Sequence, residues 1–237
     1  MTEPAPTVDS ASPEAVVFLH GVWRSARSMR RLERTLRGEG YAVHSETYPS
    51  LRQDIVANGR WLAERLEAIN APRIHFVTHS MGALVLRQCL SEREEPRLGR
   101  VVMIAPPSRG ARLADVYSRI PLFPLIMGKG ALQLRTGEEG LGASLPPPPC
   151  EFAIIAGGRG HPRGWHPQVP GDDDGTVGVT EAYLPGATAF ITVPAGHTFI
   201  MNNPRTIEAT AEFLRTGQIS VDETPLPSDE GVDEQTQ

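Results

Sequence analysis

The sequence predicts an α/β fold built on a mostly parallel sheet with helices on both faces. Short apolar runs that suit buried strands alternate with segments of helical periodicity, as is typical of parallel sheets. A length of 237 residues, 40% of them hydrophobic, fits one full-size domain with a substantial core. Polar residues suited to chemistry follow several predicted strands, at the edge where such sheets bind ligands.

Most of the predicted strands are short runs rich in Val, Ile, Phe and Ala, the composition of strands that are buried on both faces. AVVFL at 15–19 and CEFAIIA at 150–156 show this pattern, whereas 41–48 alternates between apolar and polar residues. The expected strands are residues 15–19, 41–48, 73–78, 99–105, 150–156 and 188–193.

The predicted helices separate these strands. Apolar residues recur at helical spacing through Ile55, Leu62, Leu66 and Ile69. Ser28 is a candidate N-cap for an early helix, and a proline at 204 suits the first turn of the last one. The expected helices are residues 28–38, 54–69, 81–92 and 204–215.

Residues 106–149 interrupt the alternation. They separate two predicted strands by more than forty residues, and a structureless loop of that length is unusual inside a compact domain. They include an amphipathic patch at 113–127 and end in a run of four prolines. Because they follow a strand at the binding edge, they are expected to form a cap or lid; a crossover helix with a long linker is the alternative.

The two ends of the chain differ in composition from the middle. Residues 1–13 are expected to be a disordered leader, 14–216 the folded domain, and 217–237 an acidic disordered tail. The last twenty residues hold six Asp or Glu and no Lys or Arg, so the net charge of −5 leaves the folded body nearly neutral. Such a body carries no charge signature of nucleic-acid binding, and no nucleic-acid partner is expected.

Three features favour a cytoplasmic protein. No run of 18 or more apolar residues is present, so no integral membrane segment is expected. The first dozen residues hold two acidic residues and no basic one, unlike a signal peptide. Two cysteines are too few for a disulfide framework.

The strongest chemical signal is Ser80, which lies between a buried strand and a helix in the sequence VTHSMG. A serine on such a sharp strand-to-helix turn is held in a strained backbone conformation that exposes its hydroxyl, an arrangement called the nucleophile elbow. Small residues are needed beside it because strand and helix approach closely there. Gly82 meets this need, whereas Thr78 replaces the first glycine of the usual G-x-S-x-G pattern. The alternative is that Ser80 only caps the helix.

Candidate oxyanion donors lie next to this turn and after the first strand. An acyl-transfer intermediate carries a negative oxygen, which preorganised backbone N–H groups stabilise. In folds with a nucleophile elbow, one donor is the residue after the nucleophile, here Met81. The other comes from an early loop, where His20-Gly21 precedes the second candidate, Val22. His20 itself is expected to be a structural histidine.

Two later segments supply partners for Ser80. His197 lies between the last strand and the last helix, where an imidazole can accept the serine proton as general base. A carboxylate must orient that imidazole, and Asp174 in GDDDGTV is the best candidate, with Asp173 as the fallback. The order Ser80, Asp174, His197 is the order of this triad in α/β-hydrolases. Calcium binding by the three aspartates is a weaker alternative, because the spacing of an EF-hand loop is absent.

The segments HFVTHSMGALVLR, DDGTVGV and AGHTFIMNNP resemble the bacterial lipase/esterase-like α/β-hydrolases, in particular small serine esterases related to class 2 lipases. The resemblance extends over about residues 15–215. It implies an α/β-hydrolase fold with a small cap insertion, Ser80 as nucleophile, Asp174 and His197 as its partners, and Val22 and Met81 as oxyanion donors. It implies no particular substrate.

The sequence therefore predicts a serine hydrolase that cleaves carboxylic esters through an acyl-enzyme on Ser80. This reaction needs no cofactor and no metal. The expected partner is a small-molecule or lipid-like ester, since the insertion is rich in apolar residues. Two alternatives stay open: an acyltransferase on the same scaffold, and a non-catalytic binding protein that keeps the fold.

Overall fold

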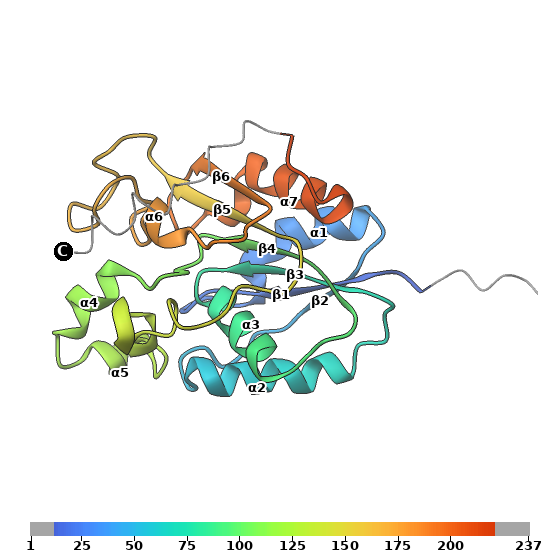
Figure 1. Ribbon diagram of the computed structural model, residues 1–237, viewed down its shortest axis with the longest axis horizontal. Helices are drawn as coiled ribbons and strands as arrows, with labels where there is room; N and C mark the ends of the chain where they lie inside the picture. The colour runs from blue at the N-terminus through green and yellow to red at the C-terminus, as the bar shows by residue number, and fades with distance from the viewer. Residues whose placement is uncertain (1–11, 221–237) are drawn as a thin grey trace, which may run out of the picture.

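The computed structural model describes residues 12–220, which form a six-stranded sheet between two layers of helices (Figure 1). All neighbouring strands are parallel, in the order β2-β1-β3-β4-β5-β6. The predicted parallel sheet with helices on both faces is confirmed. The strands are β1 Ala15–Leu19, β2 Ala42–Ser45, β3 Ile74–His79, β4 Leu98–Ile104, β5 Phe152–Gly158 and β6 Ala189–Pro194.

Helices α2 (Ile55–Glu67) and α3 (Met81–Glu92) cover one face of the sheet, and α1 (Arg30–Gly38) and α7 (Pro204–Thr216) cover the other (Figure 1). Successive side chains of a strand point to opposite faces, so Phe76 and Val77 of β3 belong to different apolar clusters. Phe76 shares its cluster with Leu84 of α3, and Val77 shares its cluster with Phe213 of α7. The same holds for Val16 and Val17 of β1, and burial on both sides explains why β1 reads as a continuous apolar run.

Two local predictions are wrong at the start of the chain. The strand expected at 41–48 is only four residues long, because its pairing with β1 ends at Ser45, opposite Phe18. Ser28 does not cap a helix: it lies inside a short 3₁₀ turn, Ala26–Met29, where its hydroxyl donates to the Ser25 carbonyl. The helix that follows begins at Arg30 without a side-chain cap.

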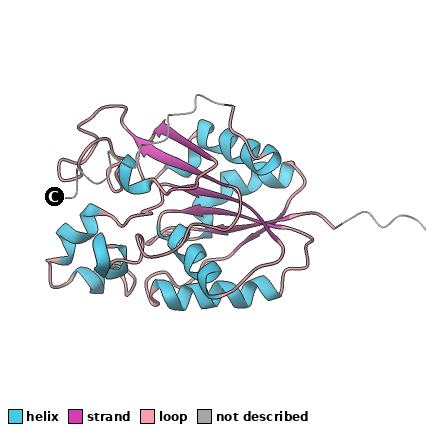
Figure 2. Ribbon diagram, viewed as in Figure 1, coloured by secondary structure: helices cyan, strands magenta, loops and turns pink. Residues whose placement is uncertain are grey.

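Residues 106–149 fold into four short helical pieces beyond the carboxyl ends of the strands (Figures 1 and 2). The amphipathic patch predicted at 113–127 is split between two of them. The pieces are α4 Arg112–Ser118, α5 Phe123–Met127, and the 3₁₀ turns Leu132–Leu134 and Gly137–Glu139. A further short helix, α6 (Val179–Ala182), was not predicted; it follows the aspartate-rich loop.

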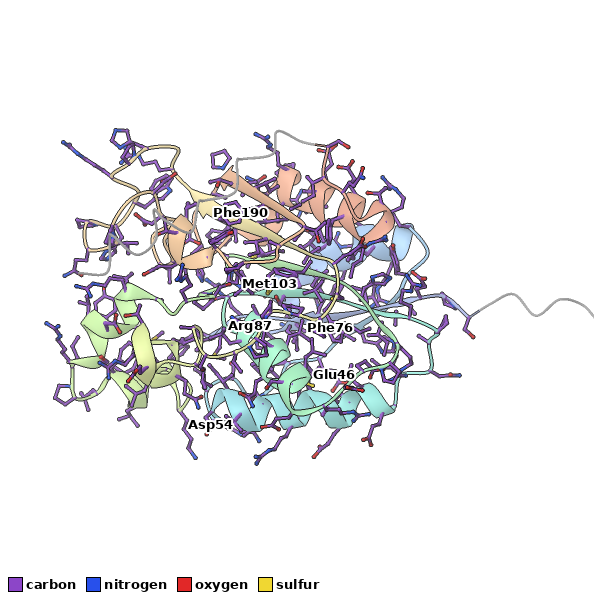
Figure 3. The ribbon with its side chains drawn as sticks, in the orientation of Figure 1. Glu46, Asp54, Phe76, Arg87, Met103 and Phe190 are labelled. Atoms are coloured by element: carbon purple, nitrogen blue, oxygen red, sulfur yellow. The ribbon has the colours of Figure 1, made fainter. Side chains whose placement is uncertain are left out.

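A buried arginine fastens both ends of this insertion to α3. Arg87, which Figure 3 labels on α3, is 1% exposed and donates to the carbonyls of Ser108, Gly142, Leu145 and Pro146. Ser108 stands where the chain enters the insertion, and the other three stand where it leaves. Burial lowers the pKa of Arg87 to about 10, so the guanidinium stays charged at neutral pH.

The chain continues to pack beyond the predicted end of the folded domain at residue 216. Gly217 ends α7 in the left-handed conformation, Ile219 is buried in the cluster of α1 and α7, and Ser220 donates to Glu212. The rest of the predicted tail, 221–237, and residues 1–11 of the predicted leader lie outside the described residues. Within residues 12–220, no helix is long and apolar enough to cross a bilayer.

Replacing Arg87 by leucine should destabilise the fold. The substitution leaves four carbonyls of the insertion without their donor, and each unpaired buried group costs about 1–3 kcal/mol before the surroundings relax. Urea denaturation of Arg87→Leu should show a loss of about 3 kcal/mol. The matched control is Arg60→Leu on α2, whose side chain is solvent-exposed and forms a surface ion pair with Glu92; its loss should stay below about 0.5 kcal/mol. Equal losses for the two variants would contradict the anchoring role of Arg87.

Candidate active site

Ser80 occupies a strained turn between β3 and α3. Its backbone has φ 53° and ψ −127°, a region that residues other than glycine rarely adopt. The Ser80 amide donates to the Ile104 carbonyl at 2.9 Å, which ties the turn to the end of β4. The arrangement is the strand-turn-helix context that the sequence predicts for this residue.

Close backbone packing surrounds the turn. A Cβ atom on Gly82 would lie 2.5 Å from the Leu19 carbonyl oxygen, so only glycine fits where α3 meets the end of β1. A Cβ on Gly21 would lie 3.1 Å from the Ser80 Cβ, which places the loop after β1 directly against the serine. Thr78, the departure from the usual motif, is fully buried between β1 and β4, where its register partners are Leu19 and Met103.

A chain of hydrogen bonds joins Ser80, His197 and Asp174. His197, after β6, has its Nε2 atom 3.0 Å from the Ser80 hydroxyl oxygen. Its Nδ1 atom is 2.7 Å from Oδ2 of Asp174, in the loop after β5. A carboxylate only accepts, so Nδ1 carries the proton and the Nε2 of the neutral ring accepts from the serine hydroxyl. The His197 amide also donates to the Asp174 carbonyl at 2.8 Å, which fixes the two loops against each other.

The three neighbouring aspartates point in different directions. Asp174 accepts from the amides of Thr176 and Val177 through its second oxygen and is 3% exposed. Asp173, the fallback, instead accepts from the amides of Trp165, His166 and Gly175. Asp172 accepts from the amides of Arg159 and Gly160. Residues 12–220 contain no group of three or more His, Cys, Asp or Glu side chains placed to hold a metal ion.

His79, the residue before Ser80, supports the histidine of this chain. Its Nε2–H donates to the His197 carbonyl at 3.1 Å, and the centroids of the two imidazole rings lie 4.9 Å apart. Burial, with a smaller effect of nearby His197, holds the pKa of His79 well below its usual value, so the ring is neutral. A histidine beside the serine is visible in the sequence, but its contact depends on the fold.

Two backbone amides, those of Met81 and Val22, are the predicted oxyanion donors. Met81 follows Ser80 in the sequence, and Val22 belongs to the loop that packs on Ser80. Met81 is the first residue of α3, where an N–H has no acceptor within the helix. Val22 stands in the turn after Gly21, whose backbone packs on Ser80. Within the described part of the chain, neither amide donates a hydrogen bond to the protein, so both are free to bind an anionic oxygen.

Glu181 joins the insertion to the loop of Asp174, a link that the sequence did not predict. Its carboxylate accepts from the Arg112 amide at the start of α4 (2.6 Å) and from the Gly178 amide (2.7 Å). Burial raises the pKa of this carboxyl group. The only signal in the sequence is the Gly178-x-x-Glu181 spacing of half a capping box.

The family model for "Domain of unknown function (DUF7379)" matches residues 2–127, just over half of the chain. The chain belongs to this DUF7379 family. No curated protein matches it in sequence. The match includes the turn of Ser80 but ends before Asp174 and His197.

Solved structures share the fold of this DUF7379 member. The mature lipase BlEst2 of Bacillus licheniformis is 20% identical, with a TM-score of 0.65 over 92% of this chain and 96% of its own. The metagenomic carboxyl esterase MGS0156 is 18% identical, with a TM-score of 0.64 over 91% and 80%. The pyrethroid hydrolase PytH is 13% identical, with a TM-score of 0.57 over 87% and 99%. At these identities the likeness shows the fold, and the predicted α/β-hydrolase fold is confirmed.

Proposed function

We propose that this protein is a serine hydrolase that cleaves carboxylic esters through an acyl-enzyme on Ser80. The observation that carries the proposal is the hydrogen-bond chain from the Ser80 hydroxyl through His197 to Asp174. These hydrogen bonds connect a nucleophile to a base and the base to a group that orients it, which is the arrangement that covalent acyl transfer requires. The strained backbone of Ser80 supports the proposal independently.

In the first half of the reaction, the Ser80 oxygen attacks the ester carbonyl carbon while its proton passes to Nε2 of His197. The Asp174 carboxylate stabilises the imidazolium that forms. The negative oxygen of the tetrahedral intermediate is held by the amides of Val22 and Met81. His197 then returns the proton to the leaving alcohol as the carbon–oxygen bond breaks, and the acyl group stays on Ser80.

In the second half, a water molecule attacks the acyl carbon and gives its proton to His197. The second tetrahedral intermediate collapses, and the proton returns to the Ser80 oxygen as the acid leaves. No cofactor and no metal take part in these steps.

The surface around the site supports a lipid-like acyl group as substrate. Among residues 12–220, six of the nine exposed large apolar side chains lie in the insertion at 106–149, beyond the carboxyl ends of the strands, and the other three lie in the loops that directly follow β1, β5 and β6. Leu125 and Phe199 are 80% and 70% exposed. The full set is Trp23, Tyr117, Ile120, Leu122, Leu125, Ile126, Leu132, Trp165 and Phe199. We therefore propose that residues 106–149 are a cap that contacts the acyl chain.

Labelling with a fluorophosphonate probe tests the nucleophile. The wild-type protein should become labelled, because the probe forms a stable adduct with an activated serine. Ser80→Ala should abolish both the labelling and the hydrolysis of p-nitrophenyl esters, with its thermal midpoint unchanged. Labelling of Ser80→Ala at the wild-type level would contradict the proposal.

The two candidate acids can be separated by a matched pair of variants. Asp174→Asn should lower kcat by roughly 10³-fold or more, because the amide donates to the imidazole and favours the wrong tautomer. Asp173→Asn should lower the thermal midpoint, because its carboxylate holds three backbone amides, and change kcat less than about tenfold. The reverse pattern of kcat values would assign the acid to Asp173.

Acyl-chain preference tests the cap. The double variant Leu122→Ser/Leu125→Ser should lower kcat/KM for p-nitrophenyl octanoate by about tenfold or more, since each lost methylene contact is worth about 0.8 kcal/mol. Activity on p-nitrophenyl acetate, which is too short to reach the cap, should change less than about twofold. An equal loss on both esters would contradict a contact between cap and acyl chain.

A further inference from the structure

A buried histidine–tyrosine pair lies beneath the loop that carries Val22, and the proposed reaction steps leave it without a role. His20 follows β1, and Tyr48 follows β2; both are 1% exposed. Their rings stack with centroids 4.3 Å apart and planes at 17°. Burying polar rings costs desolvation free energy that an apolar pair of the same size would not. A buried polar pair is therefore expected to have a role in the hydrogen bonds that it forms.

The tautomer of His20 follows from its contacts. Its Nδ1 atom lies 2.8 Å from the Gly21 carbonyl oxygen, and a carbonyl only accepts, so Nδ1 carries the proton. Its Nε2 atom is buried and has no hydrogen-bond partner among the described residues. Burial lowers the pKa of His20, which keeps the ring neutral. His20 is therefore a fixed donor to the Gly21 carbonyl.

Tyr48 holds the preceding carbonyl in the same way. Its hydroxyl donates to the His20 carbonyl at 2.6 Å, and burial raises the pKa of that hydroxyl, so it stays protonated. The Gly21 carbonyl accepts a second bond from the Arg24 amide at 3.2 Å. Two successive peptide groups, 20–21 and 21–22, are thus oriented by buried side chains.

The orientation of the second peptide group decides the direction of the Val22 N–H. A trans peptide is planar, and its C=O and N–H bonds point in opposite directions. With the Gly21 oxygen turned to the His20 ring, the Val22 N–H must point away from that ring. The loop itself packs against Ser80 and the residue before it: a Cβ on Gly21 would lie 2.9 Å from the His79 ring and 3.1 Å from the Ser80 Cβ.

We propose that His20 and Tyr48 are positioning residues that aim the Val22 N–H at the oxyanion formed on Ser80. The inference rests on the proposed ester hydrolysis, and it adds the two side chains that preorganise one of its two oxyanion donors. Preorganisation of such donors stabilises the transition state more than the bound ester. Loss of the pair therefore lowers kcat while KM changes little.

Three substitutions of His20 separate this role from simple space filling. Asparagine places an amide N–H near the position of Nδ1, glutamine places it near the position of Nε2, and leucine offers no donor. For p-nitrophenyl acetate, His20→Asn should keep kcat within about threefold of wild type. His20→Gln and His20→Leu should lower kcat by about tenfold or more, with KM within about twofold of wild type. Affinity for a trifluoromethyl ketone, whose adduct on Ser80 bears an anionic oxygen, should fall by the same factor as kcat/KM.

Matched controls come from the other end of the sheet. Tyr48→Phe should lower kcat by at least about threefold, whereas Tyr41→Phe, at a half-buried tyrosine just before β2, should not change it. His75→Leu removes another fully buried histidine, which contacts Glu14 and the Arg100 amide. It should lower the thermal midpoint and leave kcat unchanged.

The outcomes distinguish the inference from the function on which it rests. Loss of kcat in His20→Gln and His20→Leu but not in His20→Asn supports the positioning role. Equal kcat values in all three variants, or losses confined to KM, overturn it while the ester hydrolase stands. A wild type without esterase activity overturns the proposed function and this inference with it.

Discussion

The close approach of α3 to the end of β1 is the constraint on which the site depends. Glycine at position 82 lets the helix backbone lie so close to the Leu19 carbonyl that no side chain would fit between them. That approach forces the chain to reverse within one residue, and Ser80 absorbs the reversal with a positive φ. It also brings the loop of Gly21 and Val22 against the serine. The proposed nucleophile and the proposed oxyanion loop are therefore placed by one packing contact.

The other half of the site depends on backbone hydrogen bonds in the loops after β5 and β6. Asp172 and Asp173 use their carboxylates to order the loop around them, and Asp174 is left to face His197. Two hydrogen bonds hold the His197 backbone: its amide donates to the Asp174 carbonyl, and its carbonyl accepts from the His79 ring. In the proposed reaction, a histidine so held loses little further freedom when it accepts the Ser80 proton, which favours efficient proton transfer.

The sequence predicts those parts of this structure that depend on local patterns. Parallel strands such as β1 are continuous apolar runs because both of their faces are buried. Ser80 can be recognised because a strand precedes it and a helix follows it. Asp174 could be chosen over Asp173 only through the Gly-Thr-Val that follows it, since adjacent carboxylates have the same chemistry. Tyr48 and Glu181 have no clear local signal, because their partners are backbone groups that only the fold brings near. The divided helices of the insertion were missed for the same reason: the first of them begins at Arg112, whose amide donates to Glu181, a residue distant in the sequence.

The acyl-enzyme itself tests the central claim most directly. The wild-type protein, mixed with p-nitrophenyl acetate at low pH and quenched, can be digested and analysed by mass spectrometry. We expect an acetyl group on the peptide that contains Ser80, with an initial burst of p-nitrophenol of the same stoichiometry. Hydrolysis that proceeds with no acetylated Ser80, or that persists in Ser80→Ala, would contradict catalysis by this serine.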